Sequence, residues 1–161
     1  ISFVQKRFQT PIISMQTLVQ VTRELLIKLC GLLKKRNHAI RCATLSIFST
    51  NSRSQQVKIE TSRKICDPDP LAILFKEHLQ HIRFNLDNGE GVEAVKLEST
   101  LTEHSYSTQD SLNFRDTFHT PTQTDNEHAL YDLLDRLTNR LTKSAVVRFT
   151  PHQSHVPERA V

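Results

Sequence analysis

The residues with the clearest chemical potential in this sequence are basic, and they are crowded into one stretch. Residues 34–64 contain eight lysines and arginines but only one acidic residue, Glu60, so this stretch has a net charge of +7. The basic residues are Lys34, Lys35, Arg36, Arg41, Arg53, Lys58, Arg63 and Lys64. Such a density of positive charge favours a polyanionic partner. The alternative is a solvated basic surface that only aids solubility.

A short apolar motif lies in an otherwise polar segment. Residues 109–114 read QDSLNF, and no helical or strand periodicity accounts for Leu112 and Phe114. Two apolar anchors and one amide are typical of a linear motif that is buried in a partner's pocket. The pattern QxxLxF resembles the peptide by which many bacterial replication and repair proteins bind the sliding clamp, with Gln109 in a polar recess. Alternatively, Leu112, Phe114 and Phe118 fold back onto the preceding domain.

No residue set indicates catalysis or metal binding. The chain has three glycines and contains neither GxGxxG nor a P-loop. His78 and His81 have a spacing that can ligate zinc, as do His152 and His155, but no further cluster completes a four-ligand set. We therefore predict no catalytic residue, no metal site and no cofactor.

The cysteines and the hydropathy pattern indicate the cellular location. Cys30, Cys42 and Cys66 are odd in number and lack CxxC spacing, which is typical of reduced thiols in a cytosolic protein. Charges interrupt every apolar stretch before the roughly 18 residues that a membrane span needs. We expect a cytoplasmic, nucleoid-associated protein with no membrane contact.

Periodicity predicts the first half of the element order. An extended piece at 2–8 precedes a helix at 14–37, which Ser14 can cap. Strands at 40–48 and 57–63 follow, joined by a turn-rich segment. The helix face is formed by Leu18, Val21, Leu25, Leu29 and Leu32, and the strands' apolar face by Ala43, Leu45, Ile47, Val57 and Ile59.

The second half adds a helix and a strand. Asp69 can cap a helix in which Pro70 occupies the first turn. Its apolar stripe is Leu71, Leu74, Phe75, His78, Leu79 and Ile82, and a strand follows at 92–102. The predicted fold class is α+β, a βαββαβ four-stranded antiparallel sheet with both helices on one face. The open face would be polar, and Glu60 and Glu98 on it would weaken phosphate binding.

Composition divides the chain. Of 161 residues only 37% are hydrophobic, below the roughly 45–50% of a compact domain, so part of the chain lacks its own core. We predict a domain at 1–102, a flexible linker at 103–124 and a partner-docking helix and tail at 125–161. The sequence opens on Ile1 and its one methionine is Met15, so we expect a piece of a longer protein.

Several runs together resemble one family. They are TSRKICDPDPLAILFKEHLQHI, GVEAVKLESTLTE and the tail LYDLLDRLTNRLTKSAVVRFTPHQSHVPERA. They resemble the C-terminal part of ImuB-type proteins, which are Y-family DNA polymerase homologues of bacterial mutagenic repair. The SHVPERA stretch at 154–160 is the most specific part, and the clamp-like peptide lies where such proteins carry theirs.

The resemblance implies a function and partners. Residues 1–102 would be a little-finger domain that lies along the major groove of primer-template DNA and contacts phosphates. The parent protein would be a non-catalytic adaptor in translesion synthesis and SOS mutagenesis, linking the sliding clamp to an error-prone replicative-type polymerase and a RecA-like accessory protein. The chain departs from the family in being poor in Gly and Arg, which dilutes the basic face.

Two alternatives stay open. One is a ferredoxin-like protein-interaction domain that does not bind DNA. The other is the C-terminal portion of a catalytically active Y-family polymerase, whose palm carboxylates would lie upstream of Ile1.

Overall fold

The computed structural model describes residues 2–81, 91–104, 122–141 and 145–146. Its elements follow the predicted order, and the helix expected within 125–161 is present at the end. They are β1 (Ser2–Ile12), α1 (Met15–Lys34), β2 (His38–Ser49), β3 (Ser54–Ile65), α2 (Pro68–His81), β4 (Val92–His104) and α3 (Thr122–Arg140). The α+β class and the βαββαβ order are thereby confirmed.

The four strands form one antiparallel sheet in the order β1-β4-β2-β3. β1 and β3 are therefore the edge strands. Each of the two helical crossovers connects strands that are parallel to one another and separated by a third strand, β4 in one case and β2 in the other. This is the predicted split βαβ arrangement, used twice.

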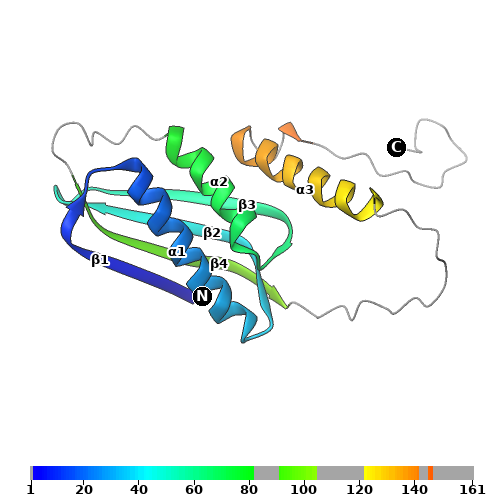
Figure 1. The fold of residues 1–161 in the computed structure, drawn as a ribbon, viewed down its shortest axis with the longest axis horizontal. Helices are drawn as coiled ribbons and strands as arrows, with labels where there is room; N and C mark the ends of the chain where they lie inside the picture. Colours follow the sequence, from blue (N-terminus) through cyan, green and yellow to red (C-terminus); the bar gives the residue numbers. More distant parts are fainter. Residues whose placement is uncertain (1, 82–90, 105–121, 142–144, 147–161) are drawn as a thin grey trace, which may run out of the picture.

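Helices α1 and α2 lie side by side on one face of the sheet (Figure 1). The alternating apolar residues of the strands are buried beneath them, as the period-two pattern predicts. The strand residues of this core include Ala43, Leu45, Ile47, Val57, Ile59, Val95 and Leu97. The opposite face of the sheet carries no helix in the described part of the chain (Figure 1).

The predicted apolar stripe of α1 is wrong at one residue. Leu18, Leu25 and Leu29 are buried, but Leu32 is 42% exposed, and Leu33 takes the place expected for Leu32. Both residues satisfy the helical spacing from Leu29, at i+3 and i+4, so periodicity alone does not distinguish them.

The start of α2 also differs from the prediction. Asp67, not Asp69, caps the helix, because its Oδ1 accepts the backbone N–H of Asp69 at 3.1 Å. The Asp69 carboxylate instead accepts from Nη2 of Arg23 on α1 at 2.7 Å. The pair Arg23–Asp69 therefore links the two helices at their exposed surface.

The third helix lies along β3 and next to α2 (Figure 1). It begins at Thr122, three residues before the predicted start of the C-terminal helix and tail at 125. Leu130, Leu133 and Leu137 of this helix, and Leu141 just after its end, are 39–56% exposed. None of the described helices is both long and apolar enough to span a membrane.

Candidate nucleic-acid interface

The open face of the sheet is built by the residues that alternate with the core residues. The strand register sets Gln5 beside Lys96, Lys96 beside Ser46, and Ser46 beside Gln56. The next row is Phe3, Glu98, Thr44 and Lys58. The face is less polar than predicted, since Phe3, Phe48 and Leu101 are exposed on it. Thr44 and Ser46 are buried, because they lie on a central strand between longer side chains.

Both lysines of this face have a carboxylate partner. Lys58 Nζ lies 2.9 Å from Glu60 Oε1, and Lys96 Nζ lies 2.5 Å from Glu98 Oε2. The hydrogen bond to Glu60 raises the pKa of Lys58. Lys96 Nζ also lies 5.1 Å from the centroid of the Phe3 ring. Each lysine can bind a phosphate only in competition with its glutamate.

A hollow beside the β2–β3 turn is lined by two arginines and a lysine, and we call it the arginine hollow. Its volume is about 310 Å³. It is lined by Gln5, Arg7, Phe48, Ser49, Ser52, Arg53, Glu93, Ala94, Val95 and Lys96. Within the described part of the chain neither Arg7 nor Arg53 forms an ion pair. Two unpaired guanidinium groups in one hollow are suited to phosphate oxygens.

A second hollow of about 400 Å³ brings Arg41 and Lys58 together on the same face. Arg41 Nε lies 3.2 Å from Glu103 Oε1, so this cation is also paired. Among the predicted DNA-binding residues, Arg41, Lys58 and Arg53 thus line hollows of the open face.

The other predicted cations lie elsewhere. Lys34, Lys35 and Arg36 lie at the C-terminal end of α1, at the end of the sheet opposite the arginine hollow. Arg36 Nη1 donates there to Ser2 Oγ at 3.3 Å. The Lys64 ammonium group donates to the His104 carbonyl at 3.1 Å. Arg63 Nη2 lies 2.6 Å from Asp132 Oδ1 of α3. The sequence cluster is therefore spread over both ends and one edge of the sheet.

The DNA-binding residues predicted from the sequence include neither Arg7 nor Lys96. Arg7 lies far from the basic stretch in sequence, and it reaches the hollow only because β1 pairs with β4. The alternation in β1 could have placed Phe3, Gln5 and Arg7 on one face, but it does not specify which strand lies beside them. The predicted clamp-binding residues Gln109, Leu112 and Phe114 lie outside the described residues.

Cys30 and Cys66 are poorly suited to nucleophilic chemistry. Burial raises the pKa of the Cys30 thiol to about 12, and burial also raises the pKa of Cys66. The Cys66 thiol donates to the carbonyls of Cys30 and His38 at 3.5 and 3.6 Å. A thiol that remains protonated is a weak nucleophile. No group of three or more metal-ligating side chains occurs among the described residues.

We expect His78 to make the domain sensitive to acid. Burial, and then the charge of His81, lower the pKa of His78 below 6.5. The unfolded chain therefore binds the proton first as the pH falls through about 6.5, and stability is lost below that pH. His78→Gln is expected to show a smaller drop in melting temperature between about pH 7.5 and about pH 5.5 than the unmodified chain. The control is His38→Gln, which replaces a histidine of β2 instead of α2. If the drop in melting temperature is the same in His78→Gln as in the unmodified chain, His78 does not have this role.

If the open face binds a nucleic-acid duplex, we expect Glu98→Gln to tighten that binding. The substitution removes the carboxylate that lies 2.5 Å from Lys96 and releases this cation for a phosphate. Titration of a fluorescent duplex should give about two- to threefold higher affinity, because one more phosphate is neutralised. Glu24→Gln, which removes a similar charge from α1, should change the affinity much less. Equal gains in both variants would show that only net charge matters.

The chain forms an α+β domain of βαββαβ order with one open, partly basic sheet face, and the fold class agrees with the prediction from the sequence. No family model matches the chain. Two proteins named ImuB, from two strains of Caulobacter vibrioides, are each 28% identical to it over 159 residues, which is 99% of this chain. The predicted resemblance to ImuB-type proteins is thereby confirmed, and the chain spans 32% of the length of these relatives.

Solved structures with a similar fold include little-finger and Y-family proteins. A complex of the β-clamp processivity factor and the little finger domain of PolIV has a TM-score of 0.47 at 14% identity, covering 69% of this chain and 96% of that chain. DinB from Sulfolobus solfataricus has a TM-score of 0.46 at 8% identity, covering 59% of this chain and 26% of that chain. At these values the likeness carries no functional inference.

Proposed function

We propose that this chain is the non-catalytic DNA-binding and scaffold portion of a Y-family polymerase-like protein that acts in translesion synthesis and damage-induced mutagenesis. The observation that carries the proposal is the arginine hollow on an uncovered sheet face. Arg7 and Arg53, which form no ion pair in the described part of the chain, bind phosphates there beside Glu93. Lys96, Lys58 and Arg41 extend the contact across the sheet. The binding is independent of base sequence, because phosphate contacts carry no sequence information.

The surrounding cations have a secondary role in this proposal. Lys34, Lys35 and Arg36 lie at the far end of the sheet, where they contact phosphates further along the duplex. Lys64 is partly engaged with Glu103 at 3.5 Å. Cations distributed over both ends of the sheet suit an extended polyanion better than a compact anion.

The proposal is tested by the salt dependence of duplex binding. The logarithm of the binding constant should fall linearly with the logarithm of salt concentration, by nearly one unit for each phosphate neutralised. With Arg7 and Arg53 as the minimum contact, we expect a slope of about −2 or steeper. Affinity that does not change with salt would exclude phosphate binding and favour the protein-interaction alternative.

The chain is further proposed to tether to the sliding clamp through Gln109, Leu112 and Phe114. A peptide spanning 107–116 should bind a purified bacterial clamp, and Leu112→Ala with Phe114→Ala should remove most of the affinity, because both apolar anchors are lost. Isothermal titration calorimetry of the two peptides measures this. A doubly substituted peptide that binds as well as the original contradicts the assignment.

The error-prone polymerase is proposed to bind the exposed leucine row of α3. This row consists of Leu130, Leu133, Leu137 and Leu141, and it lies at helical spacing on a surface that is exposed in the described structure. An apolar row of this kind is typical of a helix that binds a partner's groove. The RecA-like accessory protein is proposed as a partner from the resemblance to ImuB-type proteins alone.

A further inference from the structure

The edge strand β3 has an irregular segment at Ser62 and Arg63. Its register with β2 changes from Cys42–Glu60 to Ile40–Ile65, so residues 61–64 lie outside the ladder. Because β3 is an edge strand, its outward backbone groups also have no neighbouring strand. A bulge on an edge strand presents backbone N–H groups that need another acceptor.

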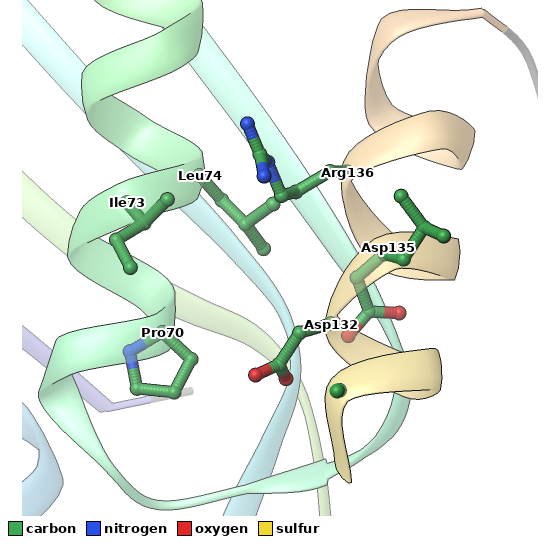
Figure 2. A pocket seen from close by; sticks show the side chains of 8 residues that line it. Pro70, Ile73, Leu74, Asp132, Asp135 and Arg136 are labelled. Atoms are coloured by element: carbon green, nitrogen blue, oxygen red, sulfur yellow. The ribbon is translucent and has the colours of Figure 1, made fainter. Parts of the chain in front are cut away.

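Side chains of α3 supply that acceptor. Asp135 Oδ1 accepts the Ser62 backbone N–H at 2.5 Å, and Asp132 Oδ1 lies 2.6 Å from Arg63 Nη2. The side-chain amide of Asn139 bonds to both backbone groups of Glu60, accepting from N–H at 3.0 Å and donating to the carbonyl at 2.6 Å. Figure 2 shows Asp132 and Asp135 on the side of α3 that faces α2 and the sheet.

The donors that these two aspartates engage have the chemistry to bind an anion. Ser62 contributes a backbone N–H, and Arg63 contributes a guanidinium that also lies 5.8 Å from the centroid of the Tyr131 ring. A backbone N–H next to a guanidinium is a donor pair that phosphate oxygens accept equally well. In the docked helix the two carboxylates therefore stand where a phosphate group could bind.

The contact between α3 and β3 buries a carboxylate at an energetic cost. Asp135 is only 2% exposed, and its second oxygen, Oδ2, is buried without a hydrogen-bond partner in the described structure. A buried carboxylate with an unsatisfied oxygen is costly. The second ion pair of α3, between Arg136 and Glu77 of α2, is partly exposed and adds little to the stability of the docked helix. The leucines at 130, 133, 137 and 141 remain 39–56% exposed, so they bury only part of their apolar surface and hold α3 less firmly than a fully buried row would.

We propose that α3 is an acidic, displaceable cover over a phosphate site formed by Ser62 and Arg63, and that duplex binding and α3 docking exclude one another at this edge. Helix α3 contains four acidic and two basic residues, so a duplex also repels it. Displacement exposes one more cation and one more backbone donor to the duplex. The inference rests on the proposed DNA-binding function and adds a regulatory element to it.

The test uses the full 161-residue chain with a cover variant, Asp132→Ala with Asp135→Ala. Its matched control, Glu24→Ala with Asp69→Ala, removes the same charge from α1 and α2. Titration with a fluorescent duplex at fixed salt should give about fivefold higher affinity for the cover variant and less than about twofold for the control. Adding Arg63→Ala to the cover variant should remove most of the gain, because Arg63 is the cation that displacement releases.

Amide hydrogen exchange at Glu60 reports docking independently of affinity. Exchange of this amide should be faster in the cover variant, and faster in the unmodified chain when saturating duplex is added, because the bond to Asn139 is lost. The inference is overturned if the cover and control variants gain affinity equally, or if duplex binds without changing this exchange rate. Inorganic phosphate at equal ionic strength should accelerate exchange less than the duplex does, because a single phosphate lacks the further cation contacts of a duplex. Equal acceleration by both would overturn the assignment to a duplex. If neither the unmodified chain nor the cover variant binds duplex, the proposed function itself is wrong.

Discussion

Reversing the two arginines of the arginine hollow, by Arg7→Glu with Arg53→Glu, is expected to weaken duplex binding by on the order of tenfold or more. Both side chains line the hollow and neither forms an ion pair in the described part of the chain, so each is available to a phosphate. Reversal removes two attractive contacts and places two carboxylates against the duplex backbone. The slope of log affinity against log salt should become shallower by about 2.

The matched control for this prediction is Lys28→Glu with Lys76→Glu. These lysines are exposed on α1 and α2, on the other side of the sheet, and the change in net charge is the same. The control should lose less than about threefold in affinity, because distant charges are screened. Fluorescence anisotropy at two salt concentrations measures both variants. Equal losses in the two would assign binding to net charge rather than to the open face.

Replacing Phe75 by alanine is expected to lower the free energy of unfolding by about 3–5 kcal/mol. Phe75 lies on α2 with no exposed surface and packs in the core between the helices and the sheet. Removing the ring loses its transfer free energy and leaves a cavity in a core that cannot fully collapse. Because a domain of this size is stable by only about 5–15 kcal/mol, the variant should be close to unfolding at physiological temperature.

The control on the same helix is Ile73→Ala. Ile73 is 52% exposed and lines the groove between α2 and α3 (Figure 2), so its truncation should cost less than about 1 kcal/mol. Urea denaturation followed by circular dichroism gives both values. A small effect at Phe75 would contradict the packing of α2 on the sheet.

The element order was predictable because the apolar residues repeat with clear periods. The strand residues Ala43, Leu45 and Ile47 alternate with polar ones, and the apolar residues of the helices recur at intervals of three or four residues. The choice between Leu32 and Leu33 was not predictable, since both continue the stripe from Leu29. The helix cap was assigned to Asp69 instead of Asp67 because the motif Asp-Pro-Asp-Pro offers two possible caps.

The interface was harder to predict because it depends on which strands are neighbours. Arg7 and Arg53 are distant in sequence and meet only through the order β1-β4-β2-β3. Gly91 gives a second example, since an added Cβ would lie 2.3 Å from Cβ of Pro11, and this close approach has no local signal. The ion pair between Arg63 and Asp132 also joins residues that are distant in sequence. The basic stretch alone predicts that Arg63 binds DNA, and it gives no sign of this acidic neighbour.

The most direct test of the proposed DNA interface is a map of amide chemical-shift changes on adding a short duplex to the isotopically labelled 161-residue chain. We predict that the largest changes occur on the open face, at Arg7, Arg53, Lys58 and Lys96, and decrease as salt is added. Changes concentrated on the exposed sides of α1 and α2, with these four amides unaffected, would contradict the assignment of this face to the duplex.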